Sequence, residues 1–399
     1  MTSSTPWQRT ARGAGLLDAT GHLRSTVFAE MSALATATGA VNLGQGFPDE
    51  DPPEAVLEAA RDALFGGSNQ YPPGRGVPTL LEAVSEHQQR FYGIDVDPGR
   101  EVLVTAGATE AIAATVLAFV DHGDEVITFE PFYDAYGAVI GLAGGRHRTV
   151  PLRGPDFRVD ADELRAAFSS RTRLVIVNDP HNPTGTLLDD ATRSSLVALA
   201  HEFDALLVTD EVYEHVVFDG VPHVPLSTLP GASERTITVS SGGKTFNATG
   251  WKIGWLSGPA SLVSQIMSVK QYLTFVNGSV FQPAIAVGLR LPREHFDDFT
   301  ADLQSKRDLL SAGLLSAGFD VSPARGSYFV VADAAPLGYD DAAEFCRALP
   351  QLAGVVGVPV SAFCGPTLAA EHSSLVRFAF CKRAEVIDEA GRRLAALRA

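Results

Sequence analysis

The sequence predicts a protein of the α/β class, in which a largely parallel sheet lies between helices and a smaller α+β domain adjoins it. From about residue 100 to residue 243, short runs rich in β-branched residues alternate with helical stretches, as crossover connections between parallel strands require. The strand runs end in polar or turn residues, and open α/β sheets bind ligands at those ends. After about residue 290 a long charged helical stretch replaces the alternation.

The composition is that of a folded globular protein. Of the 399 residues, 45% are apolar and 20% are charged, and the formal net charge is −16. This negative charge argues against a nucleic-acid-binding protein, because such a protein needs a basic face. The three cysteines form no CxxC pair, which favours reduced thiols in the cytoplasm over a zinc site or a disulfide framework. No metal is expected.

Neither a secretion signal nor a membrane span is expected. The start, MTSSTPWQRTARGAGLL, lacks the continuous apolar core of a signal peptide. The longest apolar run, at residues 111–120, stops at Asp121 and is too short to cross a bilayer. We therefore expect a cytoplasmic protein with no membrane partner.

The elements follow one another in a regular order. Residues 1–20, rich in Ser, Thr, Gly and Arg, are expected to form a mobile lead-in. A strand is predicted at EVLVTAG (101–107), followed by a helix that Gly123 closes. Further strands are predicted at EVITFEP (125–131), TRLVIVNDP (172–180), ALLVTDEVY (205–213) and RTITVSSGG (235–243), with a helix at DDATRSSLVALAHEF (189–203).

The C-terminal quarter predicts the smaller domain. Residues 293–318 are predicted to form a charged helix, GSYFVVAD (326–333) a strand, and residues 374–397 a strand followed by a helix. Residues near the N-terminus are expected to complete this domain. The predicted division is a lead-in at 1–20, a large domain at 46–289, and a small domain made of 21–45 and 290–399.

Lys244 is the first candidate for chemistry. The chain has only five lysines, and two of them, Lys244 and Lys252, lie in SSGGKTFNATGWKIGW (240–255). A phosphate-binding P-loop fails on spacing, because position 238 is threonine where that motif needs glycine. A solvated lysine is the ordinary alternative. A Schiff-base lysine is the third, because a lysine shielded from water presents a neutral amine to an aldehyde, whereas arginine stays protonated. Glycines at 242 and 243 would let the backbone approach a bulky cofactor.

Other strand ends carry residues that suit a pyridine cofactor. Asp210 lies at the end of a predicted strand, where a carboxylate could keep a pyridine nitrogen protonated. Tyr213 and the Asn182 of HNPTG could hydrogen-bond the phenolic oxygen of such a ring. Each also has an ordinary explanation, since a strand-end aspartate is usually a cap or turn residue and NPTG is a common turn.

Four residues could bind the phosphate of that cofactor. Ser241 and Lys252 supply a hydroxyl and a cation, and Ala108 and Thr109 supply backbone N–H groups where a helix begins. Thr109 could equally cap its helix. Any one residue alone is weak evidence. Together, in this order and at successive strand ends, they favour a pyridoxal phosphate site.

These motifs resemble those of the fold-type I, pyridoxal-phosphate-dependent aminotransferases of class I and II. The resemblance rests on NDPHNPTG, TDEVYEH and SSGGKTFNATGWKIGW, and it runs from TVFAEMSALA to the C-terminus. It implies a mostly parallel seven-stranded sheet in the large domain and a homodimer. The chain looks similar to two groups of the family, the N-succinyldiaminopimelate aminotransferases and the kynurenine/glutamine-type aminotransferases; EPFYDAY and SAFC lean toward the first.

The resemblance also implies roles for single residues. Lys244 would hold pyridoxal 5'-phosphate and move the proton from the substrate Cα, Phe132 would stack on the ring, and Tyr71 would reach the phosphate in the neighbouring subunit. Arg377 would clamp the substrate α-carboxylate through two parallel hydrogen bonds, a task that suits its planar fork. Gly46 would offer its backbone to the same carboxylate. The ordinary alternatives are a core phenylalanine and a solvated strand arginine.

The predicted activity is the transfer of an amino group from an L-amino acid to a 2-oxo acid. The substrate pair that we expect is N-succinyl-LL-diaminopimelate with 2-oxoglutarate, in lysine biosynthesis. A kynurenine-, glutamine- or methionine-type aminotransferase with cysteine-conjugate β-lyase side activity is the alternative. A ligand-sensing regulator on the same fold is disfavoured because the lead-in is short and the chain is acidic. A protein that keeps the fold without catalytic activity is disfavoured because Lys244, Asp210 and Tyr213 are all present.

The residues at the site entrance would decide between these substrates. A succinylated substrate needs basic or amide groups there, for which Arg75 and Asn277 are candidates. An aromatic or apolar entrance, supplied by Phe47, Tyr71 and Phe275, would favour methionine or kynurenine. The sequence leaves both open.

Overall fold

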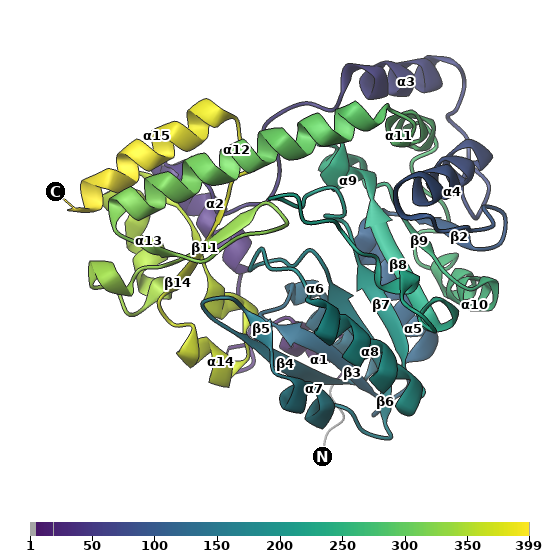
Figure 1. Ribbon diagram of the computed structural model, residues 1–399, viewed down its shortest axis with the longest axis horizontal. Coiled ribbons are helices and arrows are strands. Elements are labelled where there is room, and N and C mark those ends of the chain that lie inside the picture. The colour runs from purple at the N-terminus through teal and green to yellow at the C-terminus, as the bar shows by residue number, and fades with distance from the viewer. Residues whose placement is uncertain (1–4, 19, 399) are drawn as a thin grey trace.

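The computed structural model describes residues 5–18 and 20–398, and two sheets of different size organise them (Figure 1). The larger has eight strands among the described residues, in the order β2-β9-β8-β7-β6-β3-β4-β5. Their bounds are β2 Val102–Thr105, β3 Glu125–Glu130, β4 Arg146–Arg153, β5 Arg158–Val159, β6 Thr172–Asn178, β7 Leu206–Asp210, β8 Thr236–Ser241 and β9 Gly254–Ser257. The sheet is parallel from β8 to β4.

The strand count differs from the seven expected. The short strand β5 pairs antiparallel with β4 and adds an eighth strand at the edge. At the other edge, β9 runs antiparallel to both of its neighbours, β2 and β8. The α/β class and the mostly parallel sheet are confirmed.

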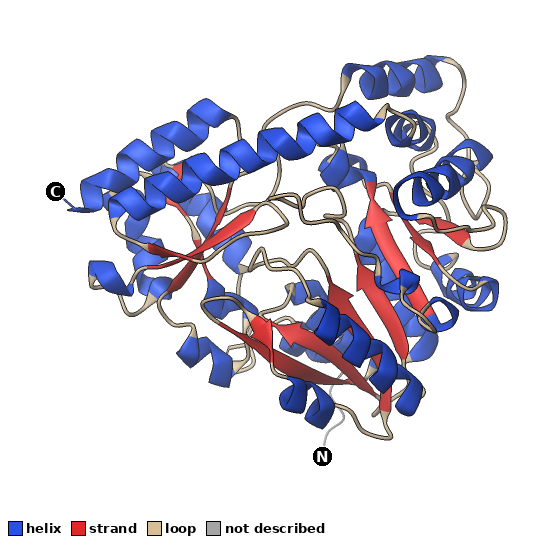
Figure 2. Cartoon of the chain, viewed as in Figure 1, coloured by secondary structure: helices blue, strands red, loops and turns tan. Residues whose placement is uncertain are grey.

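Helices cover both faces of this sheet (Figure 2). The helices α5 (Gly107–Phe119), α6 (Asp134–Ala143) and α10 (Ala260–Lys270) pack on one face, and α7 (Ala161–Ala167) and α8 (Asp190–Glu202) pack on the other. Strand β6 shows why: Leu174 and Ile176 belong to the first core, and Val175 and Val177 to the second. Because alternate side chains of a strand point to opposite faces, a continuous apolar run is buried on both.

Further helices surround the β2 edge. The helices α3 (Glu54–Phe65), α4 (Pro78–Tyr92) and α11 (Phe281–Leu289) share a core with β2 and β9. The one-turn helix α9 (Gly242–Thr245) follows β8 directly and carries Lys244. None of the described helices is both long and apolar enough to cross a membrane.

The start of the chain is more ordered than its composition predicts. Pro6–Gly13 form helix α1, which packs against α6, so the expected mobile lead-in is wrong for the described residues before 19. Glycines allow the close approach: a Cβ on Gly137 would lie 2.2 Å from the carbonyl oxygen of Gly13. The Nε of Arg9 donates a hydrogen bond to the carbonyl of Gly141 at 3.1 Å. Residues 1–4 and 19 lie outside the described part of the chain.

The smaller sheet is antiparallel and lies beside the larger one. Its order is β10-β11-β14-β13, with β10 at Asp320–Val321, β11 at Phe329–Asp333, β13 at Val358–Pro359 and β14 at Leu375–Ala379. A separate parallel pair joins β1 (Val41–Asn42) to β12 (Val355–Val356). The surrounding helices are α2 (Val27–Thr38), α12 (Arg293–Ala317), α13 (Ala342–Leu352), α14 (Pro366–Glu371) and α15 (Ala384–Leu394).

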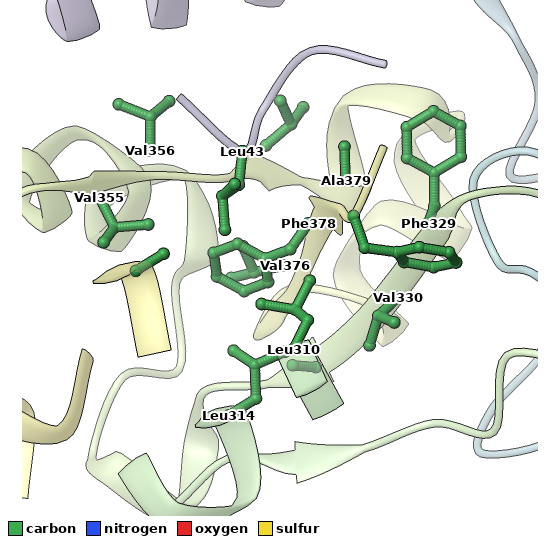
Figure 3. Packing of buried hydrophobic residues seen from close by; sticks show 14 of the residues in the cluster. Leu43, Leu310, Leu314, Phe329, Val330, Val355, Val356, Val376, Phe378 and Ala379 are labelled. Carbon is green, nitrogen blue, oxygen red and sulfur yellow. The ribbon is translucent and has the colours of Figure 1, made fainter. Parts of the chain in front are cut away.

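A single apolar core holds the smaller sheet and the helices α2, α12, α13 and α15 together (Figure 3). Leu310 and Leu314 of α12 pack with Val376 and Phe378 of β14, and Leu43 joins them from the N-terminal segment. Residues before 45 and after 290 therefore share one core. The exact division at residues 45 and 290 stays a prediction.

Candidate active site

A cavity of about 390 Å³ lies where the carboxyl ends of β6, β7 and β8 face the smaller sheet. Its wall combines residues from both sheets and from the segment between β1 and α3. Of the twelve residues predicted for the site, it brings together Gly46, Ala108, Thr109, Asn182, Asp210, Tyr213, Ser241, Lys244, Lys252 and Arg377. Phe132 and Tyr71 do not line it.

Lys244 reaches this cavity from helix α9. Its Nζ donates a hydrogen bond to the phenolic oxygen of Tyr328 at 2.8 Å and a longer one to the carbonyl of Gly46 at 3.4 Å. Burial lowers the pKa of this amine. Packing requires glycine at position 242, two residues before Lys244, because a Cβ there would lie 2.6 Å from Ile285.

Asp210 is the last residue of β7 and is 5% exposed. Its Oδ2 accepts a hydrogen bond from the hydroxyl of Tyr136 at 2.6 Å. Burial raises the pKa of Asp210 to about 6, and the Tyr136 hydrogen bond opposes this rise. Beside it on β6, Asn178 donates to the carbonyl of Asp210 at 2.8 Å and accepts from the backbone N–H of Asn182 at 2.8 Å. Asn178 thus ties Asn182 to the end of β7.

Arg377 lies in the middle of β14 and is 1% exposed. Its Nη1 donates to Oδ1 of Asn182 at 2.9 Å and its Nη2 to the carbonyl of Gly44 at 2.7 Å. Phe329 covers the guanidinium with its ring 4.0 Å away. Burial lowers the pKa of Arg377 to about 10, so it remains a cation at neutral pH.

No carboxylate of the described chain forms an ion pair with Arg377, and its Nε has no hydrogen-bond partner there. A buried charge without a counter-ion is costly. The arrangement therefore suits an anionic ligand that enters the cavity.

A second cationic corner lies at the N-terminus of α5. Its first residue, Gly107, has φ +77°, and a Cβ at this position would lie 3.2 Å from Nζ of Lys252. The backbone of Ala108 and the hydroxyls of Thr109 and Ser241 line the same part of the cavity. A helix N-terminus with a lysine and two hydroxyls is a favourable place for a phosphate.

Comparison with known proteins identifies the family. Residues 38–394 match the family described as "Aminotransferase class I and II". The chain belongs to this family. It is 52% identical over 94% of its length, and 96% of the relative, to the probable N-succinyldiaminopimelate aminotransferase DapC of Mycobacterium tuberculosis. It is 40% identical over 93% of its length, and 96% of the relative, to the methionine aminotransferase of Escherichia coli.

Solved structures agree with this membership. The structure described as N-succinyldiaminopimelate aminotransferase from Mycobacterium tuberculosis superposes with a TM-score of 0.93 at 50% identity, covering 100% of both chains. A methionine aminotransferase structure from Escherichia coli reaches a TM-score of 0.90 at 40% identity, covering 94% of this chain and 97% of the other. The predicted family is thereby confirmed, and the protein is an aminotransferase.

Phe132 does not take the place predicted for it in this aminotransferase. It lines a different cavity, of about 730 Å³, beside α1, with its ring edge-on to His147 at 4.6 Å. Tyr133 lines the active-site cavity instead. The two residues are neighbours in the extended turn before α6, where successive side chains point in opposite directions.

The entrance residues also differ from expectation. Arg75 donates to the carbonyls of Arg100 and Val102, and Asn277 donates to the carbonyls of Thr105 and Lys252, so both support backbone instead of lining the cavity. Phe47 does line the cavity.

Tyr71 and Phe275 lie together outside the cavity. Tyr71 is 82% exposed and meets the ring of Phe275 edge-on at 5.5 Å. Its predicted contact with a neighbouring subunit stays a prediction.

The site residues that sequence reasoning missed include Tyr133, Tyr136, Asn178 and Tyr328. Two motifs of the family resemblance, EPFYDAY and NDPHNPTG, contain Tyr133, Tyr136 and Asn178, and the predicted strand GSYFVVAD contains Tyr328. Their roles depend on contacts between elements, which a motif does not reveal.

A second group of buried polar residues lies outside the active-site cavity. The group consists of His87, Glu214 and His215, and we call it the histidine cluster. Nε2 of His87 lies 2.8 Å from Nε2 of His215. Oε1 of Glu214 accepts a hydrogen bond from the hydroxyl of Ser240 at 2.6 Å. Burial lowers the pKa of His87 to about 3 and raises the pKa of Glu214. None of the three residues lines the active-site cavity.

Proposed function

We propose that this aminotransferase uses pyridoxal 5'-phosphate to move the amino group of N-succinyl-LL-diaminopimelate to 2-oxoglutarate, a step in lysine biosynthesis. The observation that carries the cofactor assignment is the buried Lys244 amine in one cavity with Asp210 and the cationic corner at α5. The observation that carries the substrate assignment is the 52% identity to a probable N-succinyldiaminopimelate aminotransferase.

The residues present fit the cofactor. Asp210 would pair with the pyridine nitrogen, and Tyr136 would orient that carboxylate through its 2.6 Å hydrogen bond. Tyr213 and Asn182 would hold the phenolic oxygen, and Tyr133 would lie against the ring. Ala108, Thr109, Ser241 and Lys252 would hold the phosphate.

The chain's own groups account for the proton transfer. Pyridoxal phosphate, when bound, supplies an electron sink for the negative charge left when a substrate Cα loses its proton. Lys244 Nζ takes that proton as a general base and returns it as a general acid, which a buried amine with a lowered pKa does well near neutral pH. Arg377 holds the substrate α-carboxylate, and its contact with Asn182 links the two binding sites.

An arginine beside the cavity supports a substrate with distal carboxylates. Lys244, Lys252 and Arg377 are the Lys and Arg side chains that line the cavity, and each already has a role. Phe28 separates this cavity from a neighbouring one of about 680 Å³, which Arg24 lines. Arg24 interacts electrostatically with Asp18, but its side chain makes no hydrogen bond or ion pair within the part of the chain that the structure describes. It is therefore available to a succinyl carboxylate.

The second candidate substrate class is methionine or kynurenine. Phe28, Phe47, Tyr133 and Phe329 give the cavity an aromatic wall, which suits an apolar side chain. The 40% identity to a methionine aminotransferase favours the same reading. β-Elimination from cysteine conjugates would be a side activity of this alternative.

Two further properties belong to the proposal. A homodimer with shared active sites would place Tyr71 near the phosphate of the partner subunit, and the exposure of Tyr71 and its neighbour Phe275 is consistent with a covered surface there. The acidic composition and unpaired cysteines support a cytoplasmic enzyme.

A half-reaction tests the substrate. Cofactor-loaded protein would be mixed separately with N-succinyl-LL-diaminopimelate, glutamate, methionine and kynurenine, and the change in cofactor absorbance would be timed. Fast conversion with the succinylated compound and glutamate alone supports the proposal, whereas fast conversion with methionine or kynurenine alone contradicts it. Arg24→Ala should weaken binding of the succinylated compound by up to about fivefold and leave glutamate unaffected, because an exposed ion pair contributes at most about 1 kcal/mol.

A further inference from the structure

Tyr328 makes the shorter of the two hydrogen bonds of the Lys244 amine. Its hydroxyl donates a hydrogen bond to the carbonyl of Gly46 at 2.5 Å. A hydroxyl has one proton and two lone pairs, so a proton committed to Gly46 leaves only acceptor capacity for a second partner. Lys244 Nζ is such a partner at 2.8 Å, and it must donate. The second lone pair remains for the side chain of Tyr213, which also hydrogen-bonds Tyr328.

The protonation state of Tyr328 fits this assignment. The residue is 1% exposed, and burial raises the pKa of its hydroxyl well above the usual value. It therefore stays a neutral phenol throughout the pH range in which aminotransferases work. A neutral phenol cannot accept a proton from the substrate, but it can hold an amine in place.

Tyr328 is itself held firmly. Ser327 before it has φ +54°, a left-handed conformation that few residues other than glycine adopt, and its N–H donates to the carbonyl of Val216 at 2.9 Å. The N–H of Phe380 donates to the carbonyl of Tyr328 at 3.0 Å. The phenol ring meets the ring of Tyr213 edge-on at 5.0 Å. Its hydroxyl is therefore fixed with respect to the cavity.

Gly46 is fixed as well. A Cβ at this position would lie 2.5 Å from the ring of Phe329 and 2.8 Å from the ring of Tyr328, so only glycine brings its carbonyl this close. Tyr328 and Gly46 belong to the part of the chain that packs with the smaller sheet, whereas Lys244 follows β8 of the larger sheet. The hydrogen bonds of the amine thus cross between the two sheets.

We propose that Tyr328 is a positioning residue for Lys244. Its phenolic oxygen accepts a hydrogen bond from the free amine, and its hydroxyl proton stays in the hydrogen bond to the carbonyl of Gly46. This inference rests on the proposed function. A neutral Lys244 amine that donates hydrogen bonds to Tyr328 and Gly46 keeps its lone pair free. The amine then waits in one orientation, with its lone pair free to meet an aldehyde or a Cα proton, instead of sampling many rotamers.

The test compares Tyr328→Phe, which keeps the ring and removes the oxygen, with Tyr339→Phe. Tyr339 packs on Phe345, and its hydroxyl has no hydrogen bond within the described residues, so it serves as the matched control. Each apoprotein would be mixed with pyridoxal phosphate, and its attachment to Lys244 timed by borohydride reduction and peptide mass spectrometry. We expect Tyr328→Phe to attach about tenfold more slowly and Tyr339→Phe to match the parent, since a hydrogen bond to a charged or ionisable group contributes about 1.5 kcal/mol.

Turnover gives an independent readout. For the loaded enzyme, Tyr328→Phe should lower kcat about tenfold and leave KM within about twofold, because the phenol contacts the lysine and not the substrate. Attachment and kcat equal to the parent's would overturn the inference, and so would a raised KM with unchanged kcat. Parent protein that attaches no cofactor at Lys244 would overturn the proposed function first.

A structure of the parent apoenzyme tests the same contact without any variant. At high resolution, a Lys244 Nζ within hydrogen-bond distance of the Tyr328 oxygen supports the inference. A separation beyond about 3.5 Å contradicts it, because a donor and acceptor that far apart form no hydrogen bond.

Discussion

The active-site cavity and the histidine cluster both bury ionisable groups, but only those of the active site line the cavity. In the cluster, the His87 and His215 rings contact one another at 2.8 Å, and Glu214 binds Ser240. In the cavity, Arg377 is buried and forms no ion pair with a carboxylate within the described chain. Its Nε has no hydrogen-bond partner there. Oε2 of Glu214 also lacks a hydrogen-bond partner among the described residues, so the two regions differ in position: the groups of the cavity face a space that can admit a ligand, and those of the cluster do not line it.

Displaced pKa values do not separate the two regions. Burial lowers the pKa of Lys244 in the cavity and of His87 in the cluster, and it raises the pKa of Asp210 and of Glu214. A perturbed pKa marks burial first and function only when the group also faces a cavity. The comparison predicts that changes in the cavity affect catalysis, and changes in the cluster affect stability.

The largest effect is expected for Lys244→Ala. Removing the proposed general base should lower kcat about 10⁴-fold, at the upper end of what general acid–base catalysis contributes. The thermal midpoint of the apoprotein should stay within a few degrees of the parent's, since the lysine is buried without a carboxylate partner. Steady-state assays and a melting curve measure both. Turnover within tenfold of the parent would mean that the cavity is not where catalysis occurs.

Arg377→Ala should have the next largest effect. Loss of a charge-assisted pair with the substrate carboxylate costs about 3 kcal/mol, which is a fall in kcat/KM of about 10²-fold. Apoprotein stability should not fall in proportion, because the substitution also removes a buried cation that forms no ion pair with a described carboxylate. The assay is kcat/KM for two substrates of different side chain, with Arg377→Lys as the partial replacement. Unchanged kcat/KM would place the carboxylate clamp elsewhere.

Asp210 should make the apoprotein less stable as pH rises. Its pKa is about 6 in the folded state against an ordinary value of 3.8, so between these values the folded state binds more protons than the unfolded state. The free energy of unfolding therefore falls as pH increases from about 4 to 6, by about 3 kcal/mol for two pKa units.

Asp210→Asn is the control, because it removes this titration and keeps an acceptor for Tyr136. Urea unfolding of both apoproteins at pH 4, 5, 6 and 7 isolates the contribution of Asp210 from those of the buried histidines. The variant should gain stability relative to the parent as pH rises. A constant difference would show that the carboxyl is not destabilised by burial.

The sequence predicts the site well where it depends on strand ends. Asn178, Asp210 and Ser241 end the adjacent strands β6, β7 and β8, so a correct strand order brings the residues that follow them together. It predicts less where contacts join distant elements. The Tyr136–Asp210 bond spans 74 positions, and the Tyr328–Gly46 bond spans 282.

Local ambiguity accounts for the remaining errors. Phe132 and Tyr133 are adjacent aromatic residues, and only the turn before α6 decides which one faces the cavity. The composition of the first twenty residues is that of a mobile tail, but it does not reveal that Gly137 on α6 admits the backbone of Gly13. In both cases the deciding contact involves steric fit, which the pattern of residue types does not encode.

The smallest effect on catalysis is expected for His87→Phe in the histidine cluster. Phenylalanine keeps the ring packing against Phe91 and Phe296 but leaves the Nε2 of His215 without its partner, which costs about 1 to 3 kcal/mol of stability at pH 7.5. Because the folded pKa of His87 is about 3, the unfolded state takes up the proton first as pH falls below 6.5, and the parent loses that stability. The penalty of the variant should therefore shrink by about 2 kcal/mol between pH 6.5 and pH 5. Urea unfolding at the two pH values measures this, and kcat within about twofold of the parent's checks that the cluster is structural. A large fall in kcat with unchanged stability would erase the distinction between the two regions.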